Sequence, residues 1–95
     1  MTSAELRNSD LPGADLIERG MSDLAKRAET VDALLVSIAS PRLRALGFAV
    51  PPAFDNAEMR LYGRLATEFG DGAHSRYNAL IRRMVSFQRA AACAR

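Results

Sequence analysis

The 95-residue chain contains no tryptophan, one histidine and one cysteine. A single cysteine, Cys93, excludes an internal disulfide and fits a reducing cytoplasm. A zinc site needs three or four nitrogen, sulfur or oxygen ligands, and His74 and Cys93 are distant in the sequence. The turn at residues 69–74, FGDGAH, lacks both the spacing and the lysine of a phosphate-binding loop. We therefore expect no metal, no cofactor and no small-molecule substrate.

Long apolar runs are also missing. None approaches the ~20 residues that a membrane span requires. Residues 1–13 lack the basic and apolar regions of a signal peptide, so we expect a cytoplasmic protein that does not associate with membranes. Lys26 is the only lysine among 13 basic residues, and alanine is abundant. This composition indicates a bacterial source with a GC-rich genome.

The residues that are present are typical of one small globular domain. Apolar residues make up 48% of the chain and charged residues 25%, which separates it from disordered sequences. Aromatic residues are scarce, at 6%, so a core of Leu, Ile, Val, Met and Ala is expected, which favours helices over sheets. Residues 1–11 show no periodicity and predict a flexible tail, followed by a single helical domain over residues 12–95.

Helical spacing and end signals place the elements in the first half of that domain. Apolar residues recur at helical spacing within 12–29, from Leu16 to Ala28, and Gly20 near that face predicts a close helix–helix approach or a kink. The next stretch predicts two helices. Thr30 caps the first, and Ser40 with Pro41 starts a short second one.

The second half of the domain predicts two longer helices. Gly47 ends the short helix, and an extended connector with two prolines follows. Asp55 and Glu58 form a capping box that starts a helix ending at Gly70. The last and longest helix covers about 73–93. The sequence thus predicts an all-α fold, a compact bundle of four to five helices joined by short loops.

Charge is distributed unevenly along the chain, and the last helix is basic. Residues 73–95 contain five arginines and no acid, whereas residues 1–39 carry a net charge of −3. On a helical wheel the apolar arc of the last helix is roughly 160° wide, more than the ~100° needed to pack on one neighbour. A central helix of a small bundle would be buried on most sides, and an interface helix would show the same arc.

Phe87 lies at the edge of this arc beside Arg76 and Arg83, and aromatic residues beside arginines are typical of protein interfaces. We therefore predict a protein interface at Arg76, Arg83 and Phe87. The occupant is either a separate partner protein or a second copy of the chain in a dimer.

Nucleic-acid binding is the alternative, because clustered arginines on one surface can neutralise phosphates. No aromatic residue on that arginine face is placed to stack on bases, and the short helix after Pro41 would offer few side chains to read them. The candidate phosphate contacts are Arg42, Arg44, Arg76, Arg82, Arg83 and Arg89.

An enzyme using His74 ranks third. A catalytic histidine needs an orienting partner and a companion acid, nucleophile or metal ligand. Asp71 and Tyr77 are the only nearby candidates, and a histidine in a first helical turn is most often a capping or packing residue. The sequence therefore predicts a non-enzymatic protein, a regulatory or accessory subunit or a homodimer, that acts through protein–protein contact.

Overall fold

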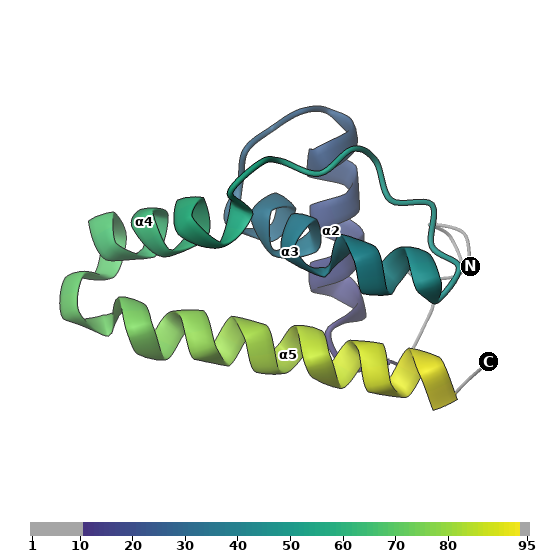
Figure 1. Cartoon of the computed structure of the whole chain (residues 1–95). Coiled ribbons are helices and arrows are strands. Elements are labelled where there is room, and N and C mark those ends of the chain that lie inside the picture. Colours follow the sequence, from purple (N-terminus) through teal and green to yellow (C-terminus); the bar gives the residue numbers. More distant parts are fainter. Residues whose placement is uncertain (1–10, 94–95) are drawn as a thin grey trace.

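A computed structural model describes residues 11–93 of the protein, and this part of the chain is all-α and compact (Figure 1). The elements are α2 (Ala14–Ala25), α3 (Val31–Ala45), α4 (Ala57–Phe69), the 3₁₀ turn η1 (Gly70–Gly72) and α5 (Ala73–Cys93). The all-α class is confirmed, and α5 is the longest helix, as predicted. The predicted tail at residues 1–11 lies, except for Leu11, outside the described residues.

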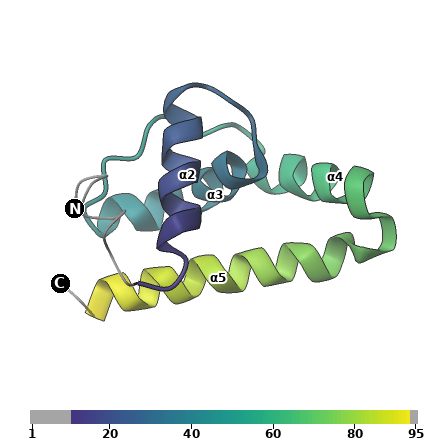
Figure 2. The same cartoon turned by 180° about the vertical axis from the view of Figure 1, so that it is seen from behind.

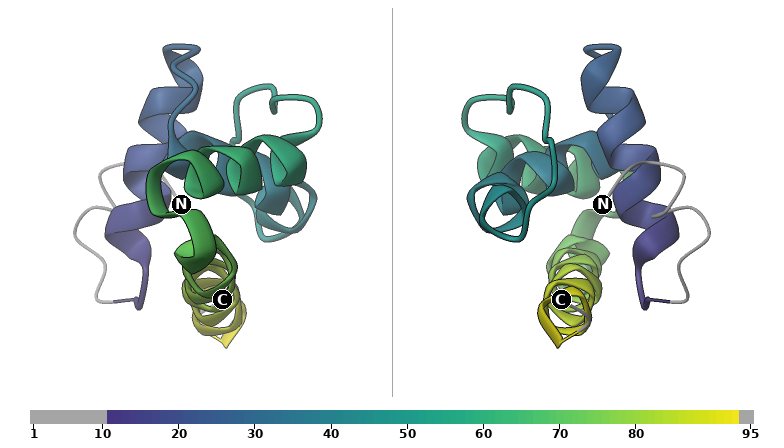
Figure 3. Two further views of the ribbon diagram at one scale, coloured as in Figure 1. Left: turned by 90° about the vertical axis from the view of Figure 1, so that its left-hand side faces the viewer. Right: turned by 90° about the vertical axis from the view of Figure 1, so that its right-hand side faces the viewer.

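Helix α5 packs against α3 and α4, whereas α2 packs mainly on α3. The 21 residues of α5 correspond to about 32 Å of helix, most of the 38 Å longest dimension of the molecule. After the η1 reversal the first half of α5 runs back along α4, and α3 lies over the second half of α5 (Figures 1 and 2). Helix α2 stands steeply across α3, and the connector between α3 and α4 loops out on the side away from α2 (Figure 3).

The core lies where α2, α3 and the second half of α5 meet, and α4 extends it. It is built mainly from leucine and other aliphatic side chains, as the scarcity of aromatics predicts. Two aromatic rings, Phe48 and Phe87, complete it, with 5.6 Å between their centroids. The largest fully buried side chains are Phe87, Leu16, Ile17, Leu24, Leu34, Leu35, Leu43, Leu61 and Val36.

Gly20 lies at the crossing of α2 and α3. A Cβ atom at this position would overlap the carbonyl oxygen of Asp32 and the Cγ2 atom of Val36. Only a residue without a side chain allows this approach. The predicted close approach is confirmed.

Both ends of α3 carry the predicted caps. The hydroxyl of Thr30 accepts a hydrogen bond from the amide of Ala33 at 3.1 Å and donates one to Asp23 at 2.8 Å. At the other end, Gly47 has a φ of 98°. The amides of Gly47 and Phe48 donate to the carbonyls of Arg44 and Leu43, which is the Schellman pattern.

The predicted helix break at Ser40 and Pro41 is wrong, because α3 continues through both residues. Pro41 removes one backbone donor, that to the carbonyl of Ser37, at a cost of about 3 kcal/mol. Continuing the helix buries Leu43 completely and Ala39 almost completely. Burial of a leucine alone stabilises by about 2 kcal/mol, so tertiary packing offsets the local break signal. The number of helices predicted from the sequence is therefore not confirmed.

Replacing the proline inside α3 should stabilise the fold. Pro41 is exposed, so Pro41→Ala leaves no cavity and restores a donor to the Ser37 carbonyl. We expect the free energy of unfolding in urea to rise by about 1–3 kcal/mol. An unchanged or lower value would mean that packing requires the local geometry that Pro41 imposes.

The predicted capping box of α4 is not formed. The N-cap residue is Asn56, with a left-handed φ of 53°, and its side chain makes no cap hydrogen bond. Asparagine tolerates this conformation, and the resulting turn moves Asp55 out of the capping position. The predicted stop at Gly70, the C-cap of α4, is confirmed.

Candidate functional site

An apolar groove of about 370 Å³ lies between α4 and α5, and the first residue of α3 also lines it. We call it the α4–α5 groove. Its walls are aliphatic and aromatic, and two of the three predicted interface residues are among those that line it. The lining residues are Val31, Leu65, Glu68, Phe69, Arg76, Ala79, Leu80 and Arg83.

Arg76 and Phe69 form one side of the α4–α5 groove. The guanidinium of Arg76 lies over the ring of Phe69, 4.3 Å from its centroid. Phe69, the last residue of α4, remains 36% exposed. Such a stacked pair holds a cation and an aromatic face together at the surface, and arginine and aromatic residues are enriched at the centres of interfaces.

Arg83 is the second arginine that lines the groove, and it contacts α2. Its guanidinium lies 3.3 Å from a carboxylate oxygen of Asp15, and both side chains are about half exposed. Exposed ion pairs of this kind contribute about 0–1 kcal/mol. The carboxylate of a partner could therefore replace Asp15 at little cost. The same Asp15 also approaches Arg19, at 3.5 Å, so Asp15 would keep a partner.

The third predicted interface residue, Phe87, lies in the core. It is 0% exposed, and it packs against Phe48. Its Cβ atom also comes close to Gly13, at the entrance to α2. The wide apolar arc of α5 therefore has two uses along the helix: the second half is buried inside the molecule, and the first half lines the α4–α5 groove.

The six arginines considered for nucleic-acid binding are all exposed, but three of them contact other residues of the protein. Arg44 donates to the carbonyls of Val50 and Pro51 and fixes the connector. Arg76 and Arg83 are engaged as described above. Arg42, Arg82 and Arg89 are exposed, on α3 and α5.

His74 is exposed in the first turn of α5. Its Nε2 atom lies 3.2 Å from the side-chain amide of Asn78, one turn further along. Tyr77 packs against Tyr62 instead, with 5.7 Å between ring centroids. Over residues 11–93, no three His, Cys, Asp or Glu side chains gather where they could hold a metal ion.

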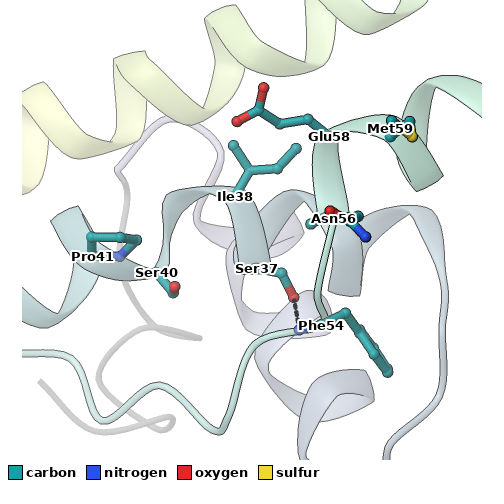
Figure 4. A pocket seen from close by; sticks show the side chains of 9 residues that line it. Ser37, Ile38, Ser40, Pro41, Phe54, Asn56, Glu58 and Met59 are labelled. Carbon is teal, nitrogen blue, oxygen red and sulfur yellow. Dashed lines mark hydrogen bonds between the residues drawn. The ribbon is translucent and has the colours of Figure 1, made fainter.

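A second groove, of about 650 Å³, lies between α3 and the start of α4 (Figure 4). We call it the α3–α4 groove. One wall is α3 with its internal proline, and the other is the end of the connector with the first turn of α4. The residues that line it are Ser37, Ile38, Ser40, Pro41, Phe54, Asn56, Ala57, Glu58 and Met59.

The α3–α4 groove is not predicted from the sequence. Ser40 and Pro41 indicate a helix start there, and Asp55 and Glu58 indicate a cap. Only the structure shows that α3 is continuous and that the connector folds back against it, where the amide of Phe54 donates to the hydroxyl of Ser37 at 3.1 Å. The exposure of Met59, at 75%, is equally unforeseen.

The raised pKa of Tyr77 makes the stability of the protein depend on pH. Burial raises the pKa of Tyr77 above its usual value near 10, and the negative charge of Glu58 raises that pKa further. The fold thus favours the neutral phenol, so this contribution to stability is complete below pH ~10 and is lost as the pH rises through the raised pKa.

Two measurements follow from this shift. The thermal midpoint should fall above pH ~10, and Tyr77→Phe should remove part of that fall. In a Tyr62→Phe background, where Tyr77 is the sole tyrosine, Glu58→Gln should lower the pKa seen by phenolate absorbance. An unchanged pKa after Glu58→Gln would contradict the placement of this carboxylate near Tyr77.

Comparisons with known proteins identify no relative from which a function could be proposed. No protein-family model, no curated protein and no solved structure matches this chain. In the described part of the chain no helix is both long enough and apolar enough to cross a membrane.

Proposed function

We propose that the protein acts without catalysis, as a small regulatory or accessory protein that binds a partner protein in the α4–α5 groove. The observation that carries the proposal is an apolar groove lined by a stacked arginine–aromatic pair and by a second, weakly paired arginine two turns further along α5. The exposed thiol of Cys93 fits a reducing compartment. We place the protein in the bacterial cytoplasm as part of the same proposal.

The groove favours an acidic, amphipathic helix of another protein as its occupant. A groove between two helices accepts the apolar face of a third helix. Arg76 and Arg83 would then meet carboxylates that flank this apolar face. Glu68 is the acid that lines the groove, so the lining residues carry a net positive charge.

Two double charge reversals on α5 test this proposal. Arg76→Glu/Arg83→Glu alters the groove, and Arg82→Glu/Arg89→Glu changes the net charge by the same amount on other exposed positions of the same helix. Each variant is used as bait, and the captured proteins are identified by mass spectrometry. A partner that fits the proposal is retained by the wild type and the control pair and is lost by about tenfold or more with the groove pair.

Equal loss with both pairs would reduce the effect to overall charge and would overturn the proposal, as would the absence of any groove-dependent partner. Light scattering on the isolated protein completes the test, with a monomer of 10.3 kDa as the expected mass. A dimer that dissociates only in the groove variant would show that the occupant is a second copy.

Nucleic-acid binding is the second candidate, because residues 73–95 contain five arginines and no acid. Three of the six proposed contacts are engaged within the protein, which weakens it. We expect no gel shift of DNA or RNA at ~50 mM salt, where electrostatic binding is strong. A shift that salt and Arg82→Glu/Arg89→Glu abolish would favour this candidate instead.

A further inference from the structure

Three arginine side chains gather where the loop between α2 and α3 meets the first two turns of α4 (Figures 1 and 2). Arg60 and Arg64 hold the two carboxylate oxygens of Glu29, at 2.8 Å and 3.1 Å. Arg27 lies over the ring of Phe54, 4.5 Å from its centroid, and Arg60 lies 6.0 Å from the same centroid. The guanidiniums of Arg27 and Arg60 are therefore no more than about 10.5 Å apart, close to the Debye length at 0.1 M salt. We call Arg27, Arg60 and Arg64 the arginine cluster.

Arg27 has a backbone conformation that is usually found in glycine. It directly follows the C-cap of α2 and has a φ of 57°, the left-handed conformation with which a glycine commonly ends a helix. A residue with a side chain is disfavoured there. The guanidinium is held by the ring of Phe54 and by the carbonyl of Pro52, to which it donates. The charge of Arg27 is therefore fixed in position before any ligand binds.

Positive charge exceeds negative charge among the groups in contact. Over residues 11–93, Glu29 is the one acid that is bonded to the arginine cluster. Lys26 adds a further exposed base at the end of α2. The other acids of these segments do not pair with the cluster: Asp23 accepts a hydrogen bond from Thr30, Glu58 lies near Tyr77 of α5, and Asp55 is exposed.

The cluster has more N–H groups than its present partners use. Each guanidinium carries five donors in a planar fork. The hydrogen bonds found over residues 11–93 use one donor of Arg27, one of Arg60 and two of Arg64. The pairs with Glu29 join side chains that are 34–45% exposed, and exposed ion pairs are weak. An anion with a larger charge can therefore displace Glu29.

We propose that the arginine cluster binds a doubly charged phosphate group, that of a phosphomonoester or of inorganic phosphate, in place of the Glu29 carboxylate. Arginine forks match the oxygens of a phosphate. A terminal phosphate carries a charge of about −1.5 to −2 at pH 7, more than the carboxylate that it displaces. A phosphodiester, as in a nucleic-acid backbone, carries one charge and would only exchange one monoanion for another. None of these residues lines the α4–α5 groove, and the two proposals do not depend on each other.

Three small anions test the charge requirement. Methyl phosphate, dimethyl phosphate and inorganic phosphate are titrated into ¹⁵N-labelled protein at ~20 mM salt, where screening is weak, and amide shifts are followed by NMR. At pH ~7.5, methyl phosphate should shift the amides of Arg27, Glu29 and Arg60 and should bind at least about threefold more tightly than dimethyl phosphate. Inorganic phosphate separates the two sources: equal affinity assigns the site to the free ion, and weaker binding assigns it to a monoester.

The pH dependence of the ligand provides a second test. Methyl phosphate gains a proton below its second pKa, near 6, so its affinity should fall about threefold or more between pH ~7.5 and pH ~5. Dimethyl phosphate has no second proton to gain, and its affinity should not fall.

Two arginine pairs locate the site. Arg60→Gln/Arg64→Gln should weaken methyl phosphate binding by about tenfold or more. Arg82→Gln/Arg89→Gln removes the same charge from exposed positions of α5 and should change the affinity by less than about twofold. Circular dichroism verifies that each variant is folded.

Removing the internal competitor should have the opposite effect. Glu29→Gln should strengthen methyl phosphate binding about threefold, because the carboxylate that occupies Arg60 and Arg64 loses its charge. Asp71→Asn makes the same change in net charge at an exposed position of η1. This matched control should leave the affinity unchanged.

Several results would overturn the proposal. Equal affinity for methyl phosphate and dimethyl phosphate would show that the second charge is not recognised. Equal loss with both arginine pairs, or an unchanged affinity in folded Arg60→Gln/Arg64→Gln, would place the binding elsewhere. Weaker binding by Glu29→Gln, or no shift with methyl phosphate, would show that the cluster only ties the loop to α4.

Discussion

Gly20→Ala should lower the free energy of unfolding by about 3 kcal/mol, although the same change in most exposed helix positions is favourable. The added Cβ atom would overlap the backbone carbonyl oxygen of Asp32 as well as the Cγ2 atom of Val36. A backbone atom cannot move to another rotamer, so α2 and α3 must separate. A chain of this length has a total stability of about 5–14 kcal/mol, and the loss is a large part of it.

Gly63→Ala is the matched control for this prediction. Gly63 lies inside α4, and nothing lies within 4 Å of an added Cβ atom. Alanine there should stabilise the protein by up to about 1 kcal/mol. Urea denaturation of the two variants should therefore give opposite signs, and a gain in stability for Gly20→Ala would contradict the close crossing of α2 and α3.

Phe87→Ala should be the most destabilising change on α5, by about 3–5 kcal/mol. The ring is fully buried, it packs on Phe48, and its Cβ atom lies close to Gly13, where the chain enters α2. Removing it would leave a cavity where α5, α2 and the connector meet, and these backbones cannot all move in to fill it.

Met59→Ala provides the comparison on the surface. Met59 is 75% exposed, so its truncation should change the free energy of unfolding by less than about 0.5 kcal/mol. Both variants are compared by urea denaturation. A loss below about 1 kcal/mol for Phe87→Ala would indicate that this ring lies at the surface, as the sequence predicts.

Local signals in the sequence predict the helix ends well where one residue carries the information. Thr30 and Gly47 act through hydrogen bonds to their immediate neighbours, and Gly70 ends α4 as expected. The break at Pro41 is wrong because burial of Leu43 and Ala39, which depends on distant residues, helps to offset the cost of a proline inside the helix. A propensity rule contains no information about that burial.

The same limit applies to the faces of α5. A helical wheel shows which residues of α5 share a face, and it placed Arg76 and Arg83 on the outer side, where the structure has them. It cannot show which part of an apolar arc a neighbouring helix covers, so Phe87 was assigned to the surface. Phe69 on α4 completes the groove with Arg76. Its contribution depends on the turn at η1, which no spacing within α5 reveals.

An NMR titration with an acidic amphipathic helical peptide tests the central claim, that the α4–α5 groove is a docking surface, most directly. We predict that the amide shifts cluster on Val31, Leu65, Phe69, Leu80 and their neighbours and that Arg76→Glu/Arg83→Glu abolishes them. Shifts that instead follow Arg82 and Arg89, or that persist in the groove variant, would contradict the claim.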